Sequence, residues 1–473
     1  MRKVNCFAQG LLLWIGFLNS PSTIALTIND VTQLNPIEVR QVIVPQSSEE
    51  ISQRIKNHKG PISIGGGKYS QGGQIATDNT LFLDMRAMNH ILNVDKENHL
   101  ITVESGITWR KIQEKIDSYN LSLKIMQSFS NFTVGGSLSV NAHGRYVNEG
   151  PIILSVRSIK LVLADGEIVS ASRDENPELF FAALGGYGGI GVIVEATLVL
   201  DDNTPVERIS HRMKLAHYKR YFLQTIRHSP DAVFHNADLY PPNYQELNAI
   251  TWVKTNKPVT VSARLAPQAR PTIYQEFLLS WISDTKLGKY FRQHWYDRYK
   301  NLGPIIEWRN NEASYDVNSI EPLSRKHSTY VLQEYFIPVE HFDSFAQKMT
   351  TILQQHKVKV LNISIRHALP DPGSYLAWAR SEVFSFVIYY KQGVSEQDKL
   401  RVRTWTSQLI DAAIEEGGTY YLPYQIIATK YQFFKAYPRA HDFFSLKNKI
   451  DPDYKFRNKL FDRYYTKIQD SQQ

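Results

Sequence analysis

The segment SIGGGKYSQGG, residues 63–73, contains residue types whose spacing indicates chemistry. After an apolar β-type run comes a set of residues that could all contact an anion: Gly65, Gly66, Gly67, Lys68, Tyr69 and Ser70. Three glycines in a row cost backbone entropy, which predicts a close approach to the main chain. Successive N–H groups in such a turn form a nest for a phosphate or pyrophosphate. Taken alone, however, the loop is explained better as an ordinary glycine-rich turn.

A second glycine pattern, GYGGIG at residues 186–191, matches the dinucleotide fingerprint G-x-G-x-x-G. That fingerprint works between a strand and a following helix, because the helix N-terminus holds the pyrophosphate. Here a helical pattern precedes the glycines and a β-rich run follows them. The sequence therefore argues against a Rossmann site and nicotinamide binding, and favours a tight turn packed against something flat.

Three strands predicted in the second half of the chain, at 331–338, 360–369 and 383–391, place polar side chains on one face. The residues that share such a face are Leu332, Glu334 and Phe336 on the first, Asn362, Ser364 and Arg366 on the second, and Ser385, Tyr389 and Lys391 on the third. A sheet with one polar face can roof a binding site, but that face can also simply meet water. The sequence leaves both interpretations open.

The elements that must position these residues follow an α+β pattern up to about residue 200. Ser47 and Glu50 form a capping box for a short helix, and Asp165-Gly166 is the predicted turn of a hairpin over 156–172. A glycine-marked loop is expected at 132–144. Further strands are expected at 38–45, 61–64, 80–85, 100–106 and 191–200, and an amphipathic helix at 108–120.

Length and composition bound the possibilities. With 473 residues the chain is too long for one ordinary core, so two domains or lobes are expected. The net charge is +8, but the basic residues are dispersed and no nucleic-acid motif occurs, which argues against a nucleic-acid partner. Cys6 is the single cysteine. Because it lies in a segment expected to be removed, disulfides, thiolate metal sites and a cysteine nucleophile are excluded, and no metal site is predicted.

Residues 1–25 have the pattern of a secretory signal peptide. Arg2 and Lys3 give a basic start, an apolar run at 11–18 is too short to span a bilayer, and small residues precede a cleavage site after Ala25. We expect a periplasmic or secreted protein with no membrane span after cleavage. The alternative is an uncleaved anchor.

Six separated motifs in a fixed order resemble the PCMH-type FAD-binding domain of the vanillyl-alcohol oxidase flavoproteins. The motifs are GGGKYSQGG, LDMRAMNHIL, VESGITW, TVGGSLSVNAHG, LVLADGEIV and NPELFFAALGGYGGIGVI, and they cover roughly residues 38–200. A C-terminal segment at 420–458, with its YL start, AYP middle and K-x-x-x-DP end, is similar to sugar-oxidising members. These members are the aldonolactone oxidases and the decaprenylphosphoryl-ribose oxidase group.

The resemblance implies an α+β fold in which a two-lobed FAD-binding domain carries a cap domain with a large antiparallel sheet. It implies a signal peptide at 1–25, the FAD-binding domain at 26–204, the substrate-binding cap at 205–415 and a segment at 416–473 that returns to the FAD domain.

The resemblance also implies the cofactor contacts. The first loop, through Ser70 with Gly73 nearby, would hold the FAD pyrophosphate. The remaining contacts would be Thr133, Val134, Gly135, Gly136, Ser137, Asn141, His143, Gly144, Ile190, Ile193 and Tyr421. Many members carry a histidine, covalently bonded to the flavin, where this chain has Tyr69. We therefore expect non-covalent FAD.

Two departures concern catalysis. Aldonolactone and alditol oxidases have a Glu-x-Arg pair on a cap strand, where this chain reads Ser364-Ile365-Arg366, and their basic or His-Trp closing motif is replaced by Leu422-Pro423-Tyr424-Gln425. Arg366 is expected to place positive charge near the flavin, although pairing with Glu334 across the sheet is an equally good explanation. The candidates for the base that oxidation of an alcohol requires are His143, Tyr389, Lys391 and Tyr424.

The expected function is FAD-dependent oxidation of a CH–OH group in a sugar, aldonolactone or polyol-like substrate, with hydride transfer to flavin N5. The alternative is a flavin-fold protein that has lost catalysis and only binds a carbohydrate. The sequence leaves open the exact substrate, the oligomeric state and the electron acceptor, which could be oxygen, a quinone or a cytochrome.

Overall fold

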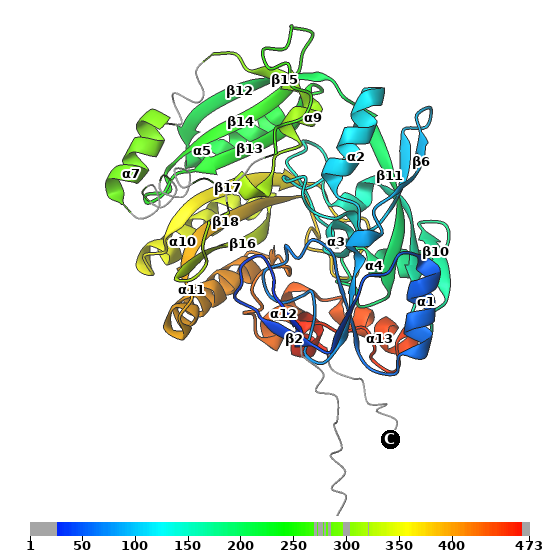
Figure 1. Ribbon diagram of the computed structural model, residues 1–473. Helices are drawn as coiled ribbons and strands as arrows, with labels where there is room; N and C mark the ends of the chain where they lie inside the picture. The colour runs from blue at the N-terminus through cyan, green and yellow to red at the C-terminus, as the bar shows by residue number, and fades with distance from the viewer. Residues whose placement is uncertain are drawn as a thin grey trace, which may run out of the picture.

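A computed structural model describes residues 26–268, 272, 278, 281, 285–296, 303–319 and 321–465 (Figure 1). The predicted signal segment at 1–25 lies outside the described residues. Helices and mainly antiparallel sheets alternate along the chain, so the predicted α+β class is confirmed. Across the described residues, the model contains no helix with the length and apolar character that a membrane span requires.

The N-terminal lobe, residues 26–202, begins with a small parallel sheet in the order β3–β5–β4, flanked by helix α1. The predicted strand at 38–45 is divided, because its first part pairs with β1 and its second part with β5. Ser47 accepts a hydrogen bond from the N–H of Glu50 at 3.2 Å and so caps α1. The bounds are β1 Leu26–Ile28, β2 Ile37–Val39, β3 Gln41–Ile43, α1 Ser48–Asn57, β4 Ile62–Gly65 and β5 Leu81–Asp84.

A second sheet of this lobe has the order β10–β9–β11–β7–β6, with β8 paired to β11. Gly166, at φ +81°, makes the expected hairpin turn between β9 and β10. The loop expected at 132–144 instead contains helix α3, whose glycine Gly135 packs against Ser105. The bounds are β6 Ile91–Asp95, β7 Leu100–Glu104, α2 Trp109–Ile116, β8 Leu121–Leu123, α3 Val134–Ser139, β9 Val156–Val162, β10 Ile168–Ser172, α4 Pro177–Ala183 and β11 Val192–Asp202.

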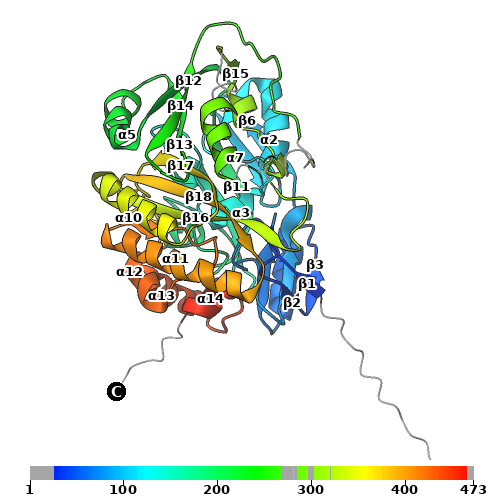
Figure 2. The ribbon, with the colours of Figure 1, turned by 90° about the vertical axis from the view of Figure 1, so that its left-hand side faces the viewer.

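The cap sheet, formed by β12–β19, has the order β15–β12–β14–β13–β17–β18–β16–β19. Helices α10 and α11 cover one face of it (Figures 1 and 2), with Phe345 against Phe386 and Trp405 against Tyr390. The strand bounds are β12 Pro205–Lys214, β13 Ala232–Leu239, β14 Glu246–Lys254, β15 Ile306–Trp308, β16 Ser328–Pro338, β17 Val360–Ala368, β18 Val383–Gly393 and β19 Thr419–Tyr420. The helix bounds are α5 Leu215–Tyr221, α7 Lys286–Phe291, α9 Arg309–Glu312, α10 Phe342–Gln355 and α11 Glu396–Glu415.

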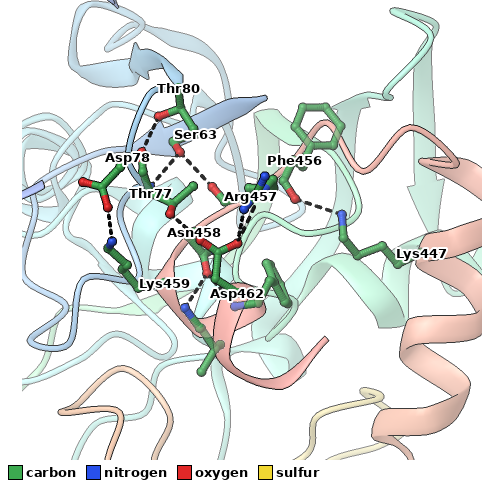
Figure 3. Close-up of polar contacts among 12 residues, drawn as sticks. Ser63, Thr77, Asp78, Thr80, Lys447, Phe456, Arg457, Asn458, Lys459 and Asp462 are labelled. Carbon is green, nitrogen blue, oxygen red and sulfur yellow. Dashed lines mark hydrogen bonds and ion pairs between the residues drawn. The ribbon is translucent and has the colours of Figure 1, made fainter. Parts of the chain in front are cut away.

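After β19 the chain runs back to the N-terminal lobe through α12 (Lys430–Ala436), α13 (Ala440–Ile450) and α14 (Lys459–Tyr464). Figure 3 shows this junction, where Ser63 donates to the carbonyl of Arg457 at 2.8 Å. Lys447 donates to the carbonyls of Phe456, at 2.9 Å, and of Gly189, at 2.8 Å. The C-terminal segment thus contacts β4, which leads into the first glycine loop, and the glycine turn at 186–191.

Candidate functional site

A cavity of about 730 Å³ lies between the N-terminal lobe and the cap sheet. Its walls come from the first glycine loop, from residues 127–143, from the turn at 187–193, from β16–β18 and from the C-terminal residues Tyr421 and Tyr424. This volume is in the range of cofactor and ligand sites. The cavity therefore joins the two features that the sequence marks separately, the glycine loops and the polar strand faces.

The first glycine loop forms part of the cavity wall. Lys68 has φ +62°, and the backbone N–H groups of Lys68, Tyr69 and Ser70 have no acceptor among the described residues. Gly66 and Gly67 lie against Thr133 at the start of α3. A Cβ on Gly66 would be 2.2 Å from Thr133 Oγ1, and Gly67 N–H donates to that same oxygen at 3.3 Å. Free, adjacent N–H groups beside a lysine form an anion cradle.

The residues predicted to bind the cofactor divide into two groups. Those that line the cavity are Gly65, Gly66, Gly67, Lys68, Tyr69, Ser70, Thr133, Gly135, Gly136, Ser137, His143, Ile193 and Tyr421. Those that do not are Gly73, Val134, Asn141, Gly144 and Ile190.

The residues outside the lining have structural surroundings instead. Val134 and Ile190 are buried in hydrophobic clusters. Asn141 donates to Asp371 at 2.6 Å, and a Cβ on Gly144 would meet the carbonyl of Met126 at 2.2 Å. Gly73, at φ +76°, packs against Lys459.

The lining fits FAD at the level of its donors and acceptors. The free N–H groups of the first loop and the Lys68 ammonium suit a pyrophosphate. Three further polar atoms on lining residues have no partner among the described residues, namely Ser105 Oγ, Gln127 Oε1 and Ser128 Oγ. Buried polar atoms normally have hydrogen-bond partners. Unsatisfied polar atoms along a cavity therefore indicate that a bound ligand provides the missing partners.

The polar faces of the cap strands line the same cavity, which decides between the two interpretations left open by the sequence. Ser364, Val387 and Glu334 form one row across β17, β18 and β16, and all three line the cavity. Arg366 and Ser385 lie in the next row. The cap sheet thus places an arginine and a carboxylate against the same cavity from different strands.

Glu334 is held on one oxygen by two donors. His143 Nε2 lies 2.6 Å from Glu334 Oε1, and Ser385 Oγ donates to the same oxygen at 2.5 Å. Burial alone would raise the pKa of Glu334. The charge and hydrogen bond of His143, with Arg366 and Ser385, outweigh burial and leave this pKa below its ordinary value.

Arg366 lines the cavity and forms no ion pair within 4.0 Å among the described residues. Its nearest hydrogen-bond partner there is Ser364 Oγ, at 3.5 Å. Burial lowers the pKa of Arg366, and the negative charge of Glu334 works against that shift. Arg366 and Glu334 therefore influence each other electrostatically without the direct pairing that the alternative interpretation requires.

The other base candidates occupy different places. Tyr424 lines the cavity, with its hydroxyl 3.3 Å from Glu334 Oε2, and burial and that carboxylate raise its pKa well above the ordinary value. Tyr389 also lines the cavity, next to Tyr330, and burial raises its pKa strongly. Lys391 does not line the cavity, although Tyr330, which lies opposite it on β16, does.

Sequence reasoning did not assign a catalytic part to Glu334. The signal that could have found it is the single carboxylate between Leu332 and Phe336 on an otherwise apolar strand face. A buried acid almost always needs a partner, and His143 was already a candidate.

Tyr69 occupies the place where the resemblance would put a flavin-linking histidine. Its ring stacks on Phe132 with 4.1 Å between ring centroids, and burial, with smaller contributions from Glu321 and Asp316, raises its pKa to about 12. A phenol with that pKa stays protonated at neutral pH.

Comparisons with known proteins find an FAD-binding domain and relatives that are named oxidases and dehydrogenases. Residues 39–172, which include both glycine-marked loops, match the family model described as FAD binding domain. The chain is 22% identical to L-gulonolactone oxidase of Mus musculus over 90% of this chain and 93% of that protein. It is 30% identical to mitochondrial L-galactono-1,4-lactone dehydrogenase of Arabidopsis thaliana over 36% of this chain and 28% of that protein, and 29% identical to cytokinin dehydrogenase 2 of the same plant over 38% and 37%.

These findings confirm the predicted PCMH-type FAD-binding domain, the likeness to aldonolactone oxidases and the class of FAD-dependent oxidoreductase. They give no support to the alternative of an inactive carbohydrate-binding protein, because the relatives are named as oxidases and dehydrogenases.

Proposed function

We propose that this chain, which carries an FAD-binding domain and is similar to an aldonolactone oxidase along nine-tenths of its length, oxidises a CH–OH group of an aldonolactone or a closely related sugar. FAD, when bound, supplies the acceptor for the hydride at its N5 position. One observation carries the proposal: a single cavity connects the anion cradle at Lys68–Ser70 with the polar face of the cap sheet.

Residues at the cap end suit a polyhydroxylated substrate. Arg366 supplies a cation that can stabilise negative charge on the reduced cofactor or on the oxygen of the substrate. Ser364 offers a hydroxyl in the same lining. Asn362 is oriented by Arg292, at 2.9 Å, and by Asp238, at 3.0 Å, so its amide is fixed at the cavity wall.

The test is an anaerobic screen in which the purified, flavin-loaded protein is mixed with aldonolactones, aldoses, alditols and polyprenyl-phosphate sugars. We expect bleaching of the flavin by L-gulonolactone, L-galactono-1,4-lactone or D-arabinono-1,4-lactone, which appear in the names of relatives. Bleaching by a polyprenyl-phosphate sugar alone would overturn the choice of substrate class. No bleaching by any of these compounds would overturn the proposed oxidation.

FAD is proposed to bind without a covalent bond, because Tyr69 replaces the nucleophilic imidazole and its phenol stays protonated. Precipitation with trichloroacetic acid is expected to release free FAD into the supernatant. A yellow pellet with a colourless supernatant would contradict the proposal.

The protein is also proposed to be exported, on the evidence of the basic start, the short apolar run and the small residues before Ala25. The mature protein from its native host is expected to begin near Leu26, which N-terminal sequencing can read. An N-terminus at Met1 in the soluble protein would argue against cleavage. The electron acceptor can be identified by offering oxygen, a soluble quinone and a cytochrome to the reduced enzyme.

A further inference from the structure

We propose that Glu334 is the base that takes the hydroxyl proton of the substrate, and that His143 and Ser385 position its carboxylate. This inference rests on the proposed oxidation of a CH–OH group. It begins from the two oxygens of Glu334, which have different surroundings. Oε1 accepts from His143 at 2.6 Å and from Ser385 at 2.5 Å, whereas the contact of Oε2 is a long one, 3.3 Å to the Tyr424 hydroxyl.

The surroundings of Glu334 keep it fixed and charged. The side chains of His143 and Glu334 are 4% and 2% exposed, so neither exchanges its partner for bulk water. Titratable groups face this carboxylate from several elements: His143 after α3, Tyr187 from the glycine turn, Arg366 on β17, and Tyr421 and Tyr424 from the C-terminal segment. The pKa of Glu334 is held below its ordinary value, so at neutral pH it is ionised and able to accept a proton.

The other candidates are less suited to accept the proton. His143 has both ring nitrogens engaged, with Nε2 on Glu334 and Nδ1 3.3 Å from the carbonyl of Gly144. Tyr424 has a pKa far above neutral, so it is a donor. Lys391 lies outside the lining. Glu334 is therefore an ionised group on the cavity wall whose second oxygen is held only by the long contact with Tyr424.

The oxidation breaks two bonds of the substrate. The C–H bond of the substrate breaks and its hydrogen leaves with both electrons as a hydride, for which oxidised FAD, when bound, would supply the acceptor. The O–H bond breaks, its proton goes to Glu334 Oε2, and its electron pair becomes the second bond of the new C=O. Hydrogen bonds from His143 and Ser385 to Oε1 keep the other oxygen directed at the cavity while this happens.

The molecule provides a matched control for this assignment. His367 Nε2 lies 2.6 Å from Glu382 Oε1, the same distance as in the proposed pair, but neither residue lines the cavity. Glu334→Gln and Glu382→Gln therefore remove the same charge from the same kind of contact. Only the first removes a carboxylate from the site.

The experiment compares wild type, Glu334→Gln, Glu334→Asp and Glu382→Gln, each loaded with FAD and reduced anaerobically by the lactone that bleaches wild type most strongly. A general base contributes on the order of a hundredfold or more. We expect Glu334→Gln to retain FAD but to be reduced at least about a hundredfold more slowly. Glu334→Asp should fall between it and wild type, and Glu382→Gln should match wild type. We expect the wild-type rate to fall at acid pH as Glu334 becomes protonated, and this fall should be absent in Glu334→Gln.

A readout that does not depend on turnover accompanies these rates. In spectra of protein labelled with ¹⁵N-histidine, Glu334→Gln should shift the His143 Nε2 resonance and Glu382→Gln should shift that of His367. Reduction of Glu334→Gln at the wild-type rate, or an unmoved His143 resonance, would overturn the assignment. If wild type itself is not reduced by any sugar, the proposed oxidation fails and the base fails with it. A failure of the base alone leaves wild-type reduction intact.

Discussion

Two histidine–glutamate pairs lie against the cap sheet, on opposite sides of it. His143 and Glu334 meet on the cavity side, and His367 and Glu382 meet on the side that packs against aromatic residues such as Phe222 and Phe384. Nε2 and the carboxylate oxygen are 2.6 Å apart in both pairs. A short histidine–carboxylate contact therefore does not by itself identify a catalytic group, and the surroundings have to decide.

The surroundings differ in two ways. Glu382 is 34% exposed and also accepts from Arg227 at 2.6 Å, and the hydrogen bond from His367 is the largest cause that lowers its pKa to about 2. Glu334 is 2% exposed, and burial opposes its ionisation, so its charge depends on His143 and on its other protein partners. His367 and Glu382 form a structural pair in which solvent helps to stabilise the charge of Glu382. His143 and Glu334 instead keep a buried charge next to a ligand site.

The largest expected effect is loss of FAD from the cavity side of the cap sheet. Gly67→Val should abolish FAD retention and leave a folded, colourless protein, because a Cβ at this position already lies 2.9 Å from the Tyr69 ring and a branched side chain would cover the free N–H groups. The measurement is the flavin absorbance of purified protein, with circular dichroism for folding. A yellow Gly67→Val protein would refute the cradle.

Gly60→Val is the control for that substitution. Gly60 lies just before β4, whereas Gly67 lies just after it. The atoms nearest to a Cβ built on Gly60 belong to the end of the His58 side chain. It should therefore retain FAD at the wild-type level.

The second prediction separates the arginines that accompany the two glutamates. Arg366→Met should keep FAD but slow its reduction by substrate about a hundredfold, equivalent to roughly 2.7 kcal/mol of transition-state stabilisation. Arg227→Met removes the partner of Glu382 and should lower the melting temperature without changing the reduction rate. Stopped-flow reduction and thermal melts measure both. If Arg366→Met changes only the melting temperature, Arg366 is structural.

The third prediction concerns the lysine that joins the C-terminal segment to the glycine turn. Lys447 is fully buried and donates hydrogen bonds to Asp451 at 2.8 Å and to the Gly189 carbonyl at 2.8 Å. Figure 3 shows its third hydrogen bond, to the carbonyl of Phe456. Lys447→Met should weaken FAD binding about tenfold, near 1.4 kcal/mol, because Gly188 and Gly191 of that turn line the cavity. Removing one member of a buried ion pair should also lower stability.

Lys459→Met is the matched control in the same view. Lys459 is partly exposed and pairs with Asp78 at the surface, so its loss should leave FAD affinity unchanged. Titration of apoprotein with FAD, followed by flavin fluorescence, distinguishes the two variants. If Lys447→Met binds FAD as tightly as wild type does, the glycine turn at 186–191 does not contribute to FAD binding.

The sequence predicts the features that depend on local spacing. The alternation in 360–369 correctly placed Asn362, Ser364 and Arg366 on one face, and the structure has the helix expected before residues 186–191 and the strand expected after them. The strand at 38–45 was wrong as a single element, because its halves pair in different sheets, a choice made by tertiary contacts.

The catalytic end of the site could not be read in the same way. Glu334 and His143 are 191 positions apart, and they meet because β16 and the segment after α3 line the same cavity. Position 364 carries no carboxylate, yet Glu334 enters the same row from two strands away. Strand order and register decide that row, and neither is encoded in the local pattern.

The smallest effect tests the pair on the helix side. In the folded protein the pKa of Glu382 is about 2, below its ordinary value of 4.5, and burial lowers the pKa of His367 below 6.5. The unfolded chain then binds more protons, so stability is fully present above these ordinary values and is lost as the pH falls, through His367 below 6.5 and through Glu382 between 4.5 and 2. Glu382→Gln should lower the free energy of unfolding at pH 7 by about 1 kcal/mol, because solvent screens a partly exposed pair. It should also flatten the loss of stability below pH 4.5, and leave flavin reduction unchanged. Urea unfolding at a series of pH values measures this, and a slowed flavin reduction in Glu382→Gln would show that the two pairs are not separable.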